Sequence, residues 1–330
     1  MPEMNLENQL REIVGGRLLL NEPMSRHTNF RLGGPADRFV VAESREEAIG
    51  VFQALADSKT PYFVLGGGSN IIVADQGYRG TVVQMALRHF EINGVEVTAE
   101  SGVLAAALSR ATVNSGVSGL EWAIGLPGTV GGAVRGNAGC WGGEMKDSVK
   151  SVEVLVIKNS SRVEREEWPA EKCGFGYRTS VFKHLSPAPI ILSANLLLQR
   201  GVAAQSAKLL REIIEKRKDK QPLQNSSAGC IFKNIELRGD EDLQKLRQDA
   251  ALPAAVTERR QIPVGWLIEQ AGLKGFAVGG ARISDKHGNF CVNTGRATAA
   301  EVLELISAVK SRVFDRYGLR LEEEIVYLGF

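Results

Sequence analysis

The feature that most constrains this chain is a glycine-rich segment at 119–143, GLEWAIGLPGTVGGAVRGNAGCWGG. Nine of its 25 residues are glycine. Glycine in a helix interior costs about 1 kcal/mol relative to alanine, so the segment is a poor candidate for a regular core helix. It is also too apolar for a flexible linker. A backbone with so few side chains is suited to direct contact with a ligand.

A second glycine cluster, LGGGSN at 65–70, follows the short apolar run PYFVL. Its backbone N–H groups can bind a phosphate, because glycine lets the backbone approach closely. The cluster lacks the Lys-Ser/Thr of a P-loop and the third glycine of a dinucleotide-binding fingerprint, so taken alone a tight turn is favoured. Together, the two clusters indicate one extended ligand that contains a diphosphate.

Short strands and amphipathic helices alternate without a regular βαβ repeat, which indicates the α+β class. Ser44 with Glu47, and Thr298 with Glu301, have the spacing of capping boxes and predict helices that begin there. We place a domain boundary near residue 200, between parts 1–200 and 201–330. The sequence also predicts strands at 61–65, 71–75, 81–85, 152–157, 189–198, 231–234 and 321–328. It predicts further helices at 203–218, 236–250 and 264–272. A turn is expected at 224–230, and a hairpin over 276–295 that turns at 285–288.

Charge and composition exclude several classes of function. Lys plus Arg number 40 against 38 for Asp plus Glu, so no global field favours nucleic acid or an anionic membrane. The four cysteines form no C-x-x-C pair and the four histidines no zinc-binding spacing, so we expect no metal site and no disulfide framework. The start of the sequence has no apolar stretch typical of a signal peptide, and the longest apolar run, at 190–198, is too short to span a bilayer. We expect a cytoplasmic monomer.

Several motifs, taken in order, make the chain recognisable. They are HTNFRLGGPAD (27–37), LGGGSN (65–70), the glycine-rich segment, CGFGYRTSVFK (173–183), KQPLQNSSAGCIFKN (220–234), GWLIEQAGLKGFAVGGARISDKHGNFCVNTG (265–295) and LEEEIVYLG (321–329). The set resembles the MurB family, the UDP-N-acetylenolpyruvoylglucosamine reductases, over nearly the whole chain. The spacing from Arg178 to Cys230 resembles the shorter, type II branch of that family.

The resemblance implies a fold and a reaction. Residues 1–200 would form an FAD-binding domain of the vanillyl-alcohol-oxidase (PCMH) type with two α+β subdomains, and residues 201–330 a smaller α+β substrate-binding domain. NADPH would reduce FAD, and reduced FAD would reduce the enolpyruvyl ether of a UDP-sugar to UDP-N-acetylmuramate, a step of peptidoglycan precursor synthesis. The two substrates would alternate in one cleft, which implies ping-pong kinetics.

Three positions match the catalytic residues of the family. Arg178 of the F-G-Y-R motif would clamp the substrate carboxylate, and Glu324 is the last Glu of the L-E-x-E motif. Cys230 would donate the proton where most members have Ser, and a thiol is acidic enough for that role, with a reference pKa of about 8.5. Without the resemblance, the favoured interpretations are a surface arginine, a solvated acidic run and a buried core cysteine. An alternative alignment of the motif, in which Ser227 and not Cys230 is the proton donor, stays open.

The resemblance also implies binding residues. Lys220, Lys233 and Asn234 match positions near the uridine diphosphate, although a lysine at the end of a helix is equally explained as a cap. The predicted FAD contacts are Leu65, Gly66, Gly67, Gly68, Ser69, Asn70, Gly125, Pro127, Gly128, Gly131, Gly132, Asn137, Ala138, Gly139 and Tyr177.

Two other functions compete with the reductase. A flavin-linked alcohol oxidase of the same superfamily would be excluded by NADPH oxidation that depends on the enolpyruvyl substrate. A non-catalytic flavoprotein that senses a cell-wall nucleotide is favoured only by Cys in place of Ser, and it predicts flavin that stays oxidised with NADPH.

Overall fold

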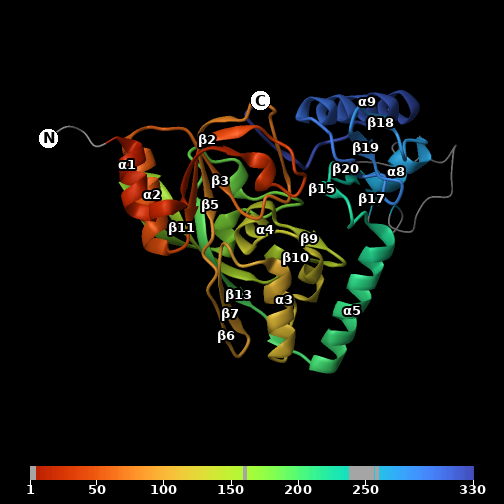
Figure 1. Cartoon of the computed structure of the whole chain (residues 1–330). Helices are drawn as coiled ribbons and strands as arrows, with labels where there is room; N and C mark the ends of the chain where they lie inside the picture. Colours follow the sequence, from red (N-terminus) through yellow and green to blue (C-terminus); the bar gives the residue numbers. More distant parts are fainter. Residues whose placement is uncertain (1–4, 159–161, 238–255, 257–259) are drawn as a thin grey trace. The chain divides into compact units, whose positions relative to one another are not determined.

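The computed structural model describes residues 5–158, 162–237, 256 and 260–330. The chain forms two compact units (Figure 1). Unit 1 consists of Met1–Glu22, Pro35–Gly67 and Tyr78–Lys216, and unit 2 of Pro23–Gly34, Gly68–Gly77 and Arg217–Phe330. These units reflect packing, so the assignment of FAD to 1–200 and of substrate to 201–330 stays a prediction.

The first sheet of unit 1 has the order β1-β2-β5-β3. Strands β2 and β3 each pair with β5 in parallel, and helix α2 connects β2 to β3. The α2 helix begins where predicted, because the Ser44 side chain accepts a hydrogen bond from the Glu47 N–H at 3.1 Å. The first layer of this unit contains α1 (Leu6–Val14), β1 (Leu18–Pro23), β2 (Pro35–Ala42), α2 (Arg45–Asp57), β3 (Tyr62–Leu65) and β5 (Tyr78–Met85).

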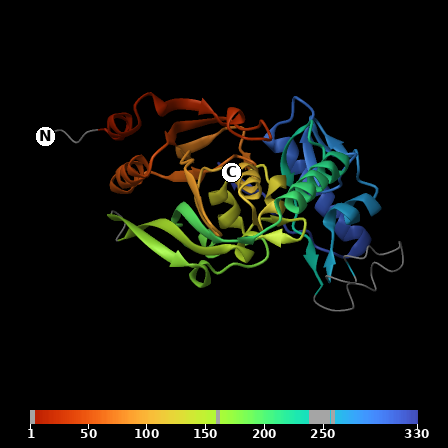
Figure 2. The same cartoon turned by 90° about the horizontal axis from the view of Figure 1, so that it is seen from below.

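A five-stranded antiparallel sheet, β12-β11-β13-β7-β6, forms the second layer of unit 1 (Figure 2). Its central strands carry fully buried residues such as Val152, Val154 and Ala194. The strands are β6 (Phe90–Asn93), β7 (Glu96–Glu100), β11 (Val149–Lys158), β12 (Arg162–Pro169) and β13 (Ile190–Leu197). The remaining elements of the unit are α3 (Ala105–Asn114), β8 (Val117–Ser118), α4 (Val130–Gly136), β9 (Gly139–Cys140), β10 (Gly143–Glu144), β14 (Gln199–Arg200) and five 3₁₀ helices at Gly15–Arg17, Glu121–Gly125, Met145–Asp147, Ala170–Cys173 and Val181–Lys183.

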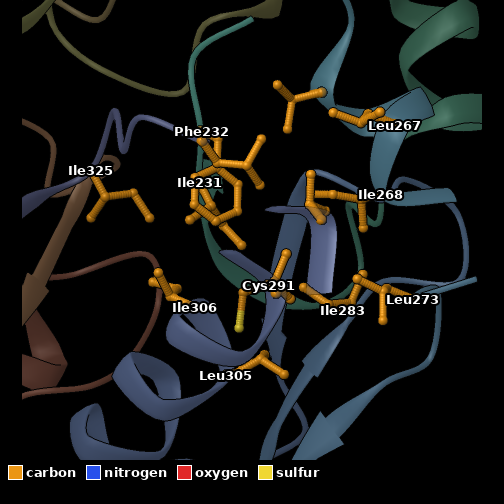
Figure 3. Close-up of a cluster of buried hydrophobic side chains, with 14 of the residues drawn as sticks. Ile231, Phe232, Leu267, Ile268, Leu273, Ile283, Cys291, Leu305, Ile306 and Ile325 are labelled. Carbon is orange, nitrogen blue, oxygen red and sulfur yellow. The ribbon is translucent and has the colours of Figure 1, made fainter. Parts of the chain in front are cut away.

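Unit 2 is built on a four-stranded sheet, β15-β20-β19-β18, with α9 packed against it (Figure 1). A separate parallel pair joins β21 to β4. Figure 3 shows the apolar core of this unit, in which Ile231 and Phe232 lie among Ile268, Ile283 and Ile306. The elements of unit 2 are β4 (Ile71–Val73), β15 (Ser226–Cys230), β16 (Ile235–Glu236), β17 (Gln261–Ile262), α8 (Val264–Gln270), β18 (Ala277–Val278), β19 (Ala281–Ile283), β20 (Phe290–Asn293), α9 (Ala299–Tyr317), β21 (Val326–Leu328) and the 3₁₀ helix Met24–Arg26. Helix α5 (Ala203–Lys220) is divided between the units, with its residues up to Lys216 in unit 1 and the rest in unit 2.

Most predicted elements are confirmed, and three predictions are wrong in detail. The Ser-Gly-rich stretch 224–230 was expected to be a turn, but Ser226–Cys230 is strand β15, with a register shift between Ser227 and Cys230. Gly229, at φ +81°, lies in that irregular stretch. The strand expected at 231–234 is absent: Phe232 forms only a single bridge to Glu323. The strand expected at 321–328 shortens to Val326–Leu328.

The helix predicted at 236–250 lies largely outside the described residues, and Glu236 itself ends strand β16. Among the helices that the structure describes, none is long and apolar enough to cross a membrane.

The start of α9 depends on residues from two distant parts of the chain. Thr298 and Glu301 form both hydrogen bonds of the predicted capping box. The Asp75 carboxylate also accepts the N–H groups of Ala299 at 2.8 Å and Ala300 at 3.0 Å. Asp75 therefore attaches the segment Gly68–Gly77 to the C-terminal helix of unit 2.

The substitution Asp75→Ala should lower the free energy of unfolding by about 1 kcal/mol, because it leaves two N–H groups at the start of α9 without their acceptor. The matched control is Asp57→Ala, which removes an exposed carboxylate at the end of α2. The midpoint of urea denaturation measures the stability of both variants. Equal midpoints for the two variants would contradict this role of Asp75.

Candidate functional site

The two glycine clusters meet within unit 1. A Cβ atom on Gly66 would lie 2.6 Å from the Thr129 Oγ1, and one on Gly67 would lie 3.3 Å from the Gly128 Cα. Side chains at either position would therefore push apart the turn that follows β3 and the loop that precedes α4. The sequence predicted that these segments share a ligand, and the structure brings Gly66 and Gly67 directly against Pro127–Thr129.

The glycines of the second cluster fall into two groups. Gly131 and Gly139 are required by packing: a Cβ on Gly131 would lie 2.7 Å from the Ser101 Cβ, and one on Gly139 would lie 2.6 Å from the Glu144 Cβ. Gly132 and Gly136 have no such neighbour, since the nearest atom to a Gly132 Cβ is the Thr129 Oγ1 at 3.7 Å and nothing lies within 4 Å of a Gly136 Cβ. Together with Gly142, which also has nothing within 4 Å of its Cβ, this second group leaves open space for a ligand.

Asn137 connects the glycine-rich segment to the loop that carries Arg178. Its buried side chain donates to the Glu144 carboxylate at 2.8 Å and to the Gly176 carbonyl at 2.9 Å, and it accepts the Lys146 N–H. These hydrogen bonds use both N–H groups of the amide and one acceptor position of its oxygen, and the predicted contact of Asn137 with the cofactor stays a prediction. Asn137 is therefore placed to support the loop at Gly176, two residues before Arg178.

Arg178 lies in the left-handed region, at φ +54°. Lys183 donates to its carbonyl at 2.7 Å, and its guanidinium lies over the ring of Tyr177, with the Cζ 5.7 Å from the ring centroid. A non-glycine residue in this region is uncommon, and such strained residues cluster at functional sites. The geometry is consistent with a functional role for Arg178.

Cys230 and Glu324 are brought together within unit 2, although 93 residues separate them in the sequence. The Glu324 N–H donates to the Ile231 carbonyl at 2.8 Å, and the Lys233 N–H donates to the Glu322 carbonyl at 2.9 Å. Both residues are partly buried. Two of the three predicted catalytic residues therefore lie on backbone segments that are hydrogen-bonded to each other.

The end of the first glycine cluster joins this arrangement. The Asn70 side chain donates to the Glu324 carbonyl at 3.1 Å, and the Asn70 carbonyl accepts the Val326 N–H at 3.1 Å. The Ser69 carbonyl oxygen lies 3.9 Å from where a Gly229 Cβ would be. Gly68 allows a close approach to His27, since a Cβ there would lie 2.0 Å from the His27 carbonyl oxygen. Residues 68–70, predicted to bind the cofactor, thus pack beside Cys230 and Glu324.

The predicted diphosphate contacts lie on two segments, the end of α5 and the loop between β15 and β16. Lys220 is the exposed last residue of α5. Lys233 forms an ion pair with Glu322, and the Asn234 Oδ1 accepts the Val264 N–H at 3.2 Å, at the start of α8. The remaining predicted cofactor residues are buried or half-buried in unit 1, apart from the exposed Pro127; they are Leu65 at the end of β3, Gly125 at the end of a 3₁₀ helix, and Ala138 after α4.

Sequence reasoning missed Asn289. Its amide accepts the Phe232 N–H at 2.9 Å and donates to the Phe232 carbonyl at 2.8 Å, and its own carbonyl accepts the Ile231 N–H at 2.9 Å. The side chain is 2% exposed. The only signal in the sequence was its place inside the motif at 265–295, where an asparagine at the end of a turn suggests turn geometry rather than a long-range contact.

Three ionisable groups near these segments have shifted pKa values. Burial lowers the pKa of Arg135 in the glycine-rich segment. Burial, together with the charge of Lys274, lowers the pKa of His287, whose Nδ1 accepts the Asn289 N–H at 3.1 Å. The pKa of Glu323 is lowered because hydrogen bonds from Lys310 and Tyr327 outweigh its burial. In the described part of the chain, no group of three His, Cys, Asp or Glu residues could hold a metal ion.

The chain is similar over its whole length to curated UDP-N-acetylenolpyruvoylglucosamine reductases. It is 38% identical to that of Caldanaerobacter subterraneus subsp. tengcongensis over 98% of both chains. It is 37% identical to that of Carboxydothermus hydrogenoformans over 100% of both. The chain belongs to the UDP-N-acetylenolpyruvoylglucosamine reductase family. A domain model described as the C-terminal domain of this reductase matches residues 221–328, and one described as an FAD binding domain matches 36–163.

A solved structure of the reductase family agrees with this assignment. The Thermus caldophilus UDP-N-acetylenolpyruvylglucosamine reductase (MurB) matches with a TM-score of 0.73 at 34% identity, covering 94% of this chain and 98% of its own. The expected α+β architecture, with an FAD-binding domain followed by the reductase C-terminal domain, is confirmed. The roles of individual residues stay predictions.

The open position of Gly132 gives a test of the predicted cofactor site. Gly132→Val should lower the affinity for FAD by about tenfold or more, because an overpacked contact costs roughly 1–3 kcal/mol. Gly131→Val is unsuitable, since its side chain would collide with Ser101 whether or not FAD is bound. The flavin absorbance per protein measures the effect.

The control is Gly16→Val, at a position in unit 1 with ordinary φ and nothing within 4 Å of its Cβ. Equal flavin content in the two purified variants would contradict the placement of FAD along α4.

Proposed function

We propose that this protein is a UDP-N-acetylmuramate dehydrogenase. It uses NADPH and FAD to reduce UDP-N-acetyl-3-O-(1-carboxyvinyl)-glucosamine to UDP-N-acetylmuramate in peptidoglycan precursor synthesis. Full-length similarity to curated reductases supports the activity. Substrates such as a UDP-linked sugar and NADPH imply that the enzyme acts in the cytoplasm. The expected monomeric state stays a prediction.

The observation that carries the proposal is the juxtaposition of Cys230 and Glu324. They come from distant motifs, yet the Glu324 N–H bonds to the carbonyl of Ile231, the residue after Cys230. Both residues thus lie on hydrogen-bonded backbone segments, and a thiol and a carboxylate carried by neighbouring segments can serve general acid catalysis. An alcohol oxidase has no need of a proton donor at a carbon atom, so this arrangement favours the reductase.

The residues of unit 1 fit an FAD molecule. Gly66 and Gly67 bring the turn after β3 directly against Pro127–Thr129, and Gly132, in helix α4 that follows this loop, is exposed. Arg135 is a partly desolvated cation, which a bound diphosphate would offset. FAD, when bound, supplies hydride chemistry between NADPH and the enolpyruvyl double bond. The chain's own contribution is to bind both partners, stabilise charge and deliver a proton.

Arg178 and Glu324 act on the acidic end of the substrate. A guanidinium can bind a carboxylate through two parallel hydrogen bonds, and it stabilises the negative charge that develops there once hydride has added to the double bond. The left-handed backbone of Arg178 and its anchoring by Lys183 preorganise this group. Lys220, Lys233 and Asn234 would bind the diphosphate end, for which Lys233 would exchange its present partner, Glu322.

Cys230 completes the reduction by transferring its thiol proton to the remaining carbon. Ser227 is the weaker candidate, because it lies three residues earlier on β15, opposite Val292, while Cys230 directly precedes the residue that bonds to Glu324. The Cys230 thiolate that results is reprotonated from solvent. The hydride and the proton together saturate the double bond.

Anaerobic spectroscopy of the purified protein tests the activity. The protein should show a flavin absorbance that bleaches with NADPH and returns when the enolpyruvyl substrate is added. A flavin that NADPH leaves oxidised would overturn the proposal and favour a binding protein.

Substitution of Cys230 tests the proton donor. Cys230→Ala should lower turnover by about 10²–10⁴-fold, the usual effect of losing a general acid, while Cys230→Ser retains much more activity because a hydroxyl can replace the thiol. Flavin reduction by NADPH should be nearly unchanged in both.

The control is Cys173→Ala. Burial raises the pKa of Cys173 to about 11 and that of Cys291 to about 12, so iodoacetamide should modify Cys230 well before either. Full activity of Cys230→Ala would refute the assignment and turn attention to Ser227.

A further inference from the structure

The backbone that follows Cys230 is held along two edges. On one edge, residues 322–324 bond to it through the Ile231 carbonyl and the Lys233 N–H. On the other edge lies Asn289. Its carbonyl accepts the Ile231 N–H, and its amide makes two hydrogen bonds to the Phe232 backbone, at 2.9 and 2.8 Å. The side chain of Asn289 thus substitutes for a neighbouring strand at a point where regular strand pairing has ended.

The ladder between β15 and β20 explains why this substitution matters. Its last pair is Cys230 with Phe290. Beyond that pair no strand of the described residues continues on this edge, so without Asn289 both polar groups of the Phe232 backbone would be buried without these partners. Phe232 is 1% exposed, and each such group costs about 1–3 kcal/mol. Asn289 therefore fixes the direction in which the chain leaves Cys230.

Asn289 is itself fixed. It follows the turn at 285–288, its N–H donates to the His287 Nδ1, and His287 packs edge-on against Phe290 at 5.0 Å between ring centroids. Gly288 allows that turn to approach α8, because a Cβ there would lie 2.4 Å from the Gly265 carbonyl oxygen. The backbone of Asn289, from which the side chain reaches Phe232, is consequently held in place.

We propose that Asn289 is a positioning residue for the reduction, which orients Cys230 through the backbone of Ile231 and Phe232 that follows it, and Glu324 through the bond of its N–H to the Ile231 carbonyl. The inference rests on the proposed function, because it assigns Asn289 to the protonation half of that reaction. Asn289 need not touch substrate or flavin. Its loss should leave flavin reduction by NADPH intact and slow the step that needs the proton donor.

The experiment compares Asn289→Ala with Asn293→Ala as holoenzymes. Asn293, the last residue of β20, is a matched control, since its side chain also makes hydrogen bonds to backbone groups, but to Phe30 and to the turn at 295–297. Anaerobic stopped-flow absorbance measures flavin reduction by NADPH and reoxidation by the enolpyruvyl substrate separately. Asn289→Ala should slow reoxidation by about 10- to 100-fold, the effect of a displaced catalytic group, and change reduction by less than about twofold. Asn293→Ala should change neither rate.

A double-mutant cycle separates positioning from general loss of structure. In a Cys230→Ala background the proton donor is already gone, so Asn289→Ala should slow reoxidation much less than it does alone. An undiminished effect in that background, an equal loss in both half-reactions, or reoxidation like that of Asn293→Ala would overturn the inference. If Asn289→Ala does not fold, Asn289→Asp replaces it, because it keeps an acceptor for the Phe232 N–H and loses the donor to the Phe232 carbonyl.

The wild-type protein distinguishes this inference from the proposed function. Failure of the enolpyruvyl substrate to reoxidise wild-type flavin would mean that the function is wrong, before any variant is compared. Normal wild-type reoxidation with an unaffected Asn289→Ala variant would mean that only the role of Asn289 is wrong.

Discussion

The hydrogen bonding of residues 231–233 is the constraint on which the candidate site in unit 2 depends. This short segment is paired to residues 322–324 on one edge and to Asn289 on the other. The side chains add a second anchor, because Ile231, Phe232 and Ile325 all extend into the same apolar core (Figure 3). Cys230 and Glu324 each adjoin a residue that is buried in this core. A close-packed interior resists small displacements, so the backbone that carries these two predicted catalytic residues is held rigidly.

Glycine serves two purposes in unit 1, and the structure separates them. Gly131 and Gly139 let protein segments approach each other, whereas Gly132 and Gly136 border open space. Gly66 and Gly67 belong to the first kind, since a Cβ on either would crowd the loop before α4. A cofactor with a diphosphate suits the open positions, because backbone N–H groups can reach it there. The high glycine content is thus partly architectural and only partly a signature of binding.

The sequence predicted local features well because local chemistry specifies them. Ser44 and Thr298 cap their helices as their spacing requires, and the hairpin over 276–295 forms between β19 and β20. The two glycine clusters, which the sequence predicted to share a ligand, do pack against each other at Gly66, Gly67 and Pro127–Thr129, and the shared ligand stays a prediction. Long-range contacts were beyond it: nothing in the sequence pairs Gly131 with Ser101, Asp75 with the start of α9, or Asn289 with Phe232. The stretch 224–234 was misread for the same reason, since pairing with β20 overrides its turn-like composition.

Amide hydrogen exchange of the native protein tests the central claim most directly. Backbone N–H groups in loops exchange quickly, whereas those in cooperatively hydrogen-bonded core segments are protected up to the global free energy of unfolding. The account predicts that the N–H groups of Ile231, Phe232 and Glu324 are protected as strongly as those of β20. Exchange of these three at the rate of an exposed turn would show that the segment carrying Cys230 is not held as described.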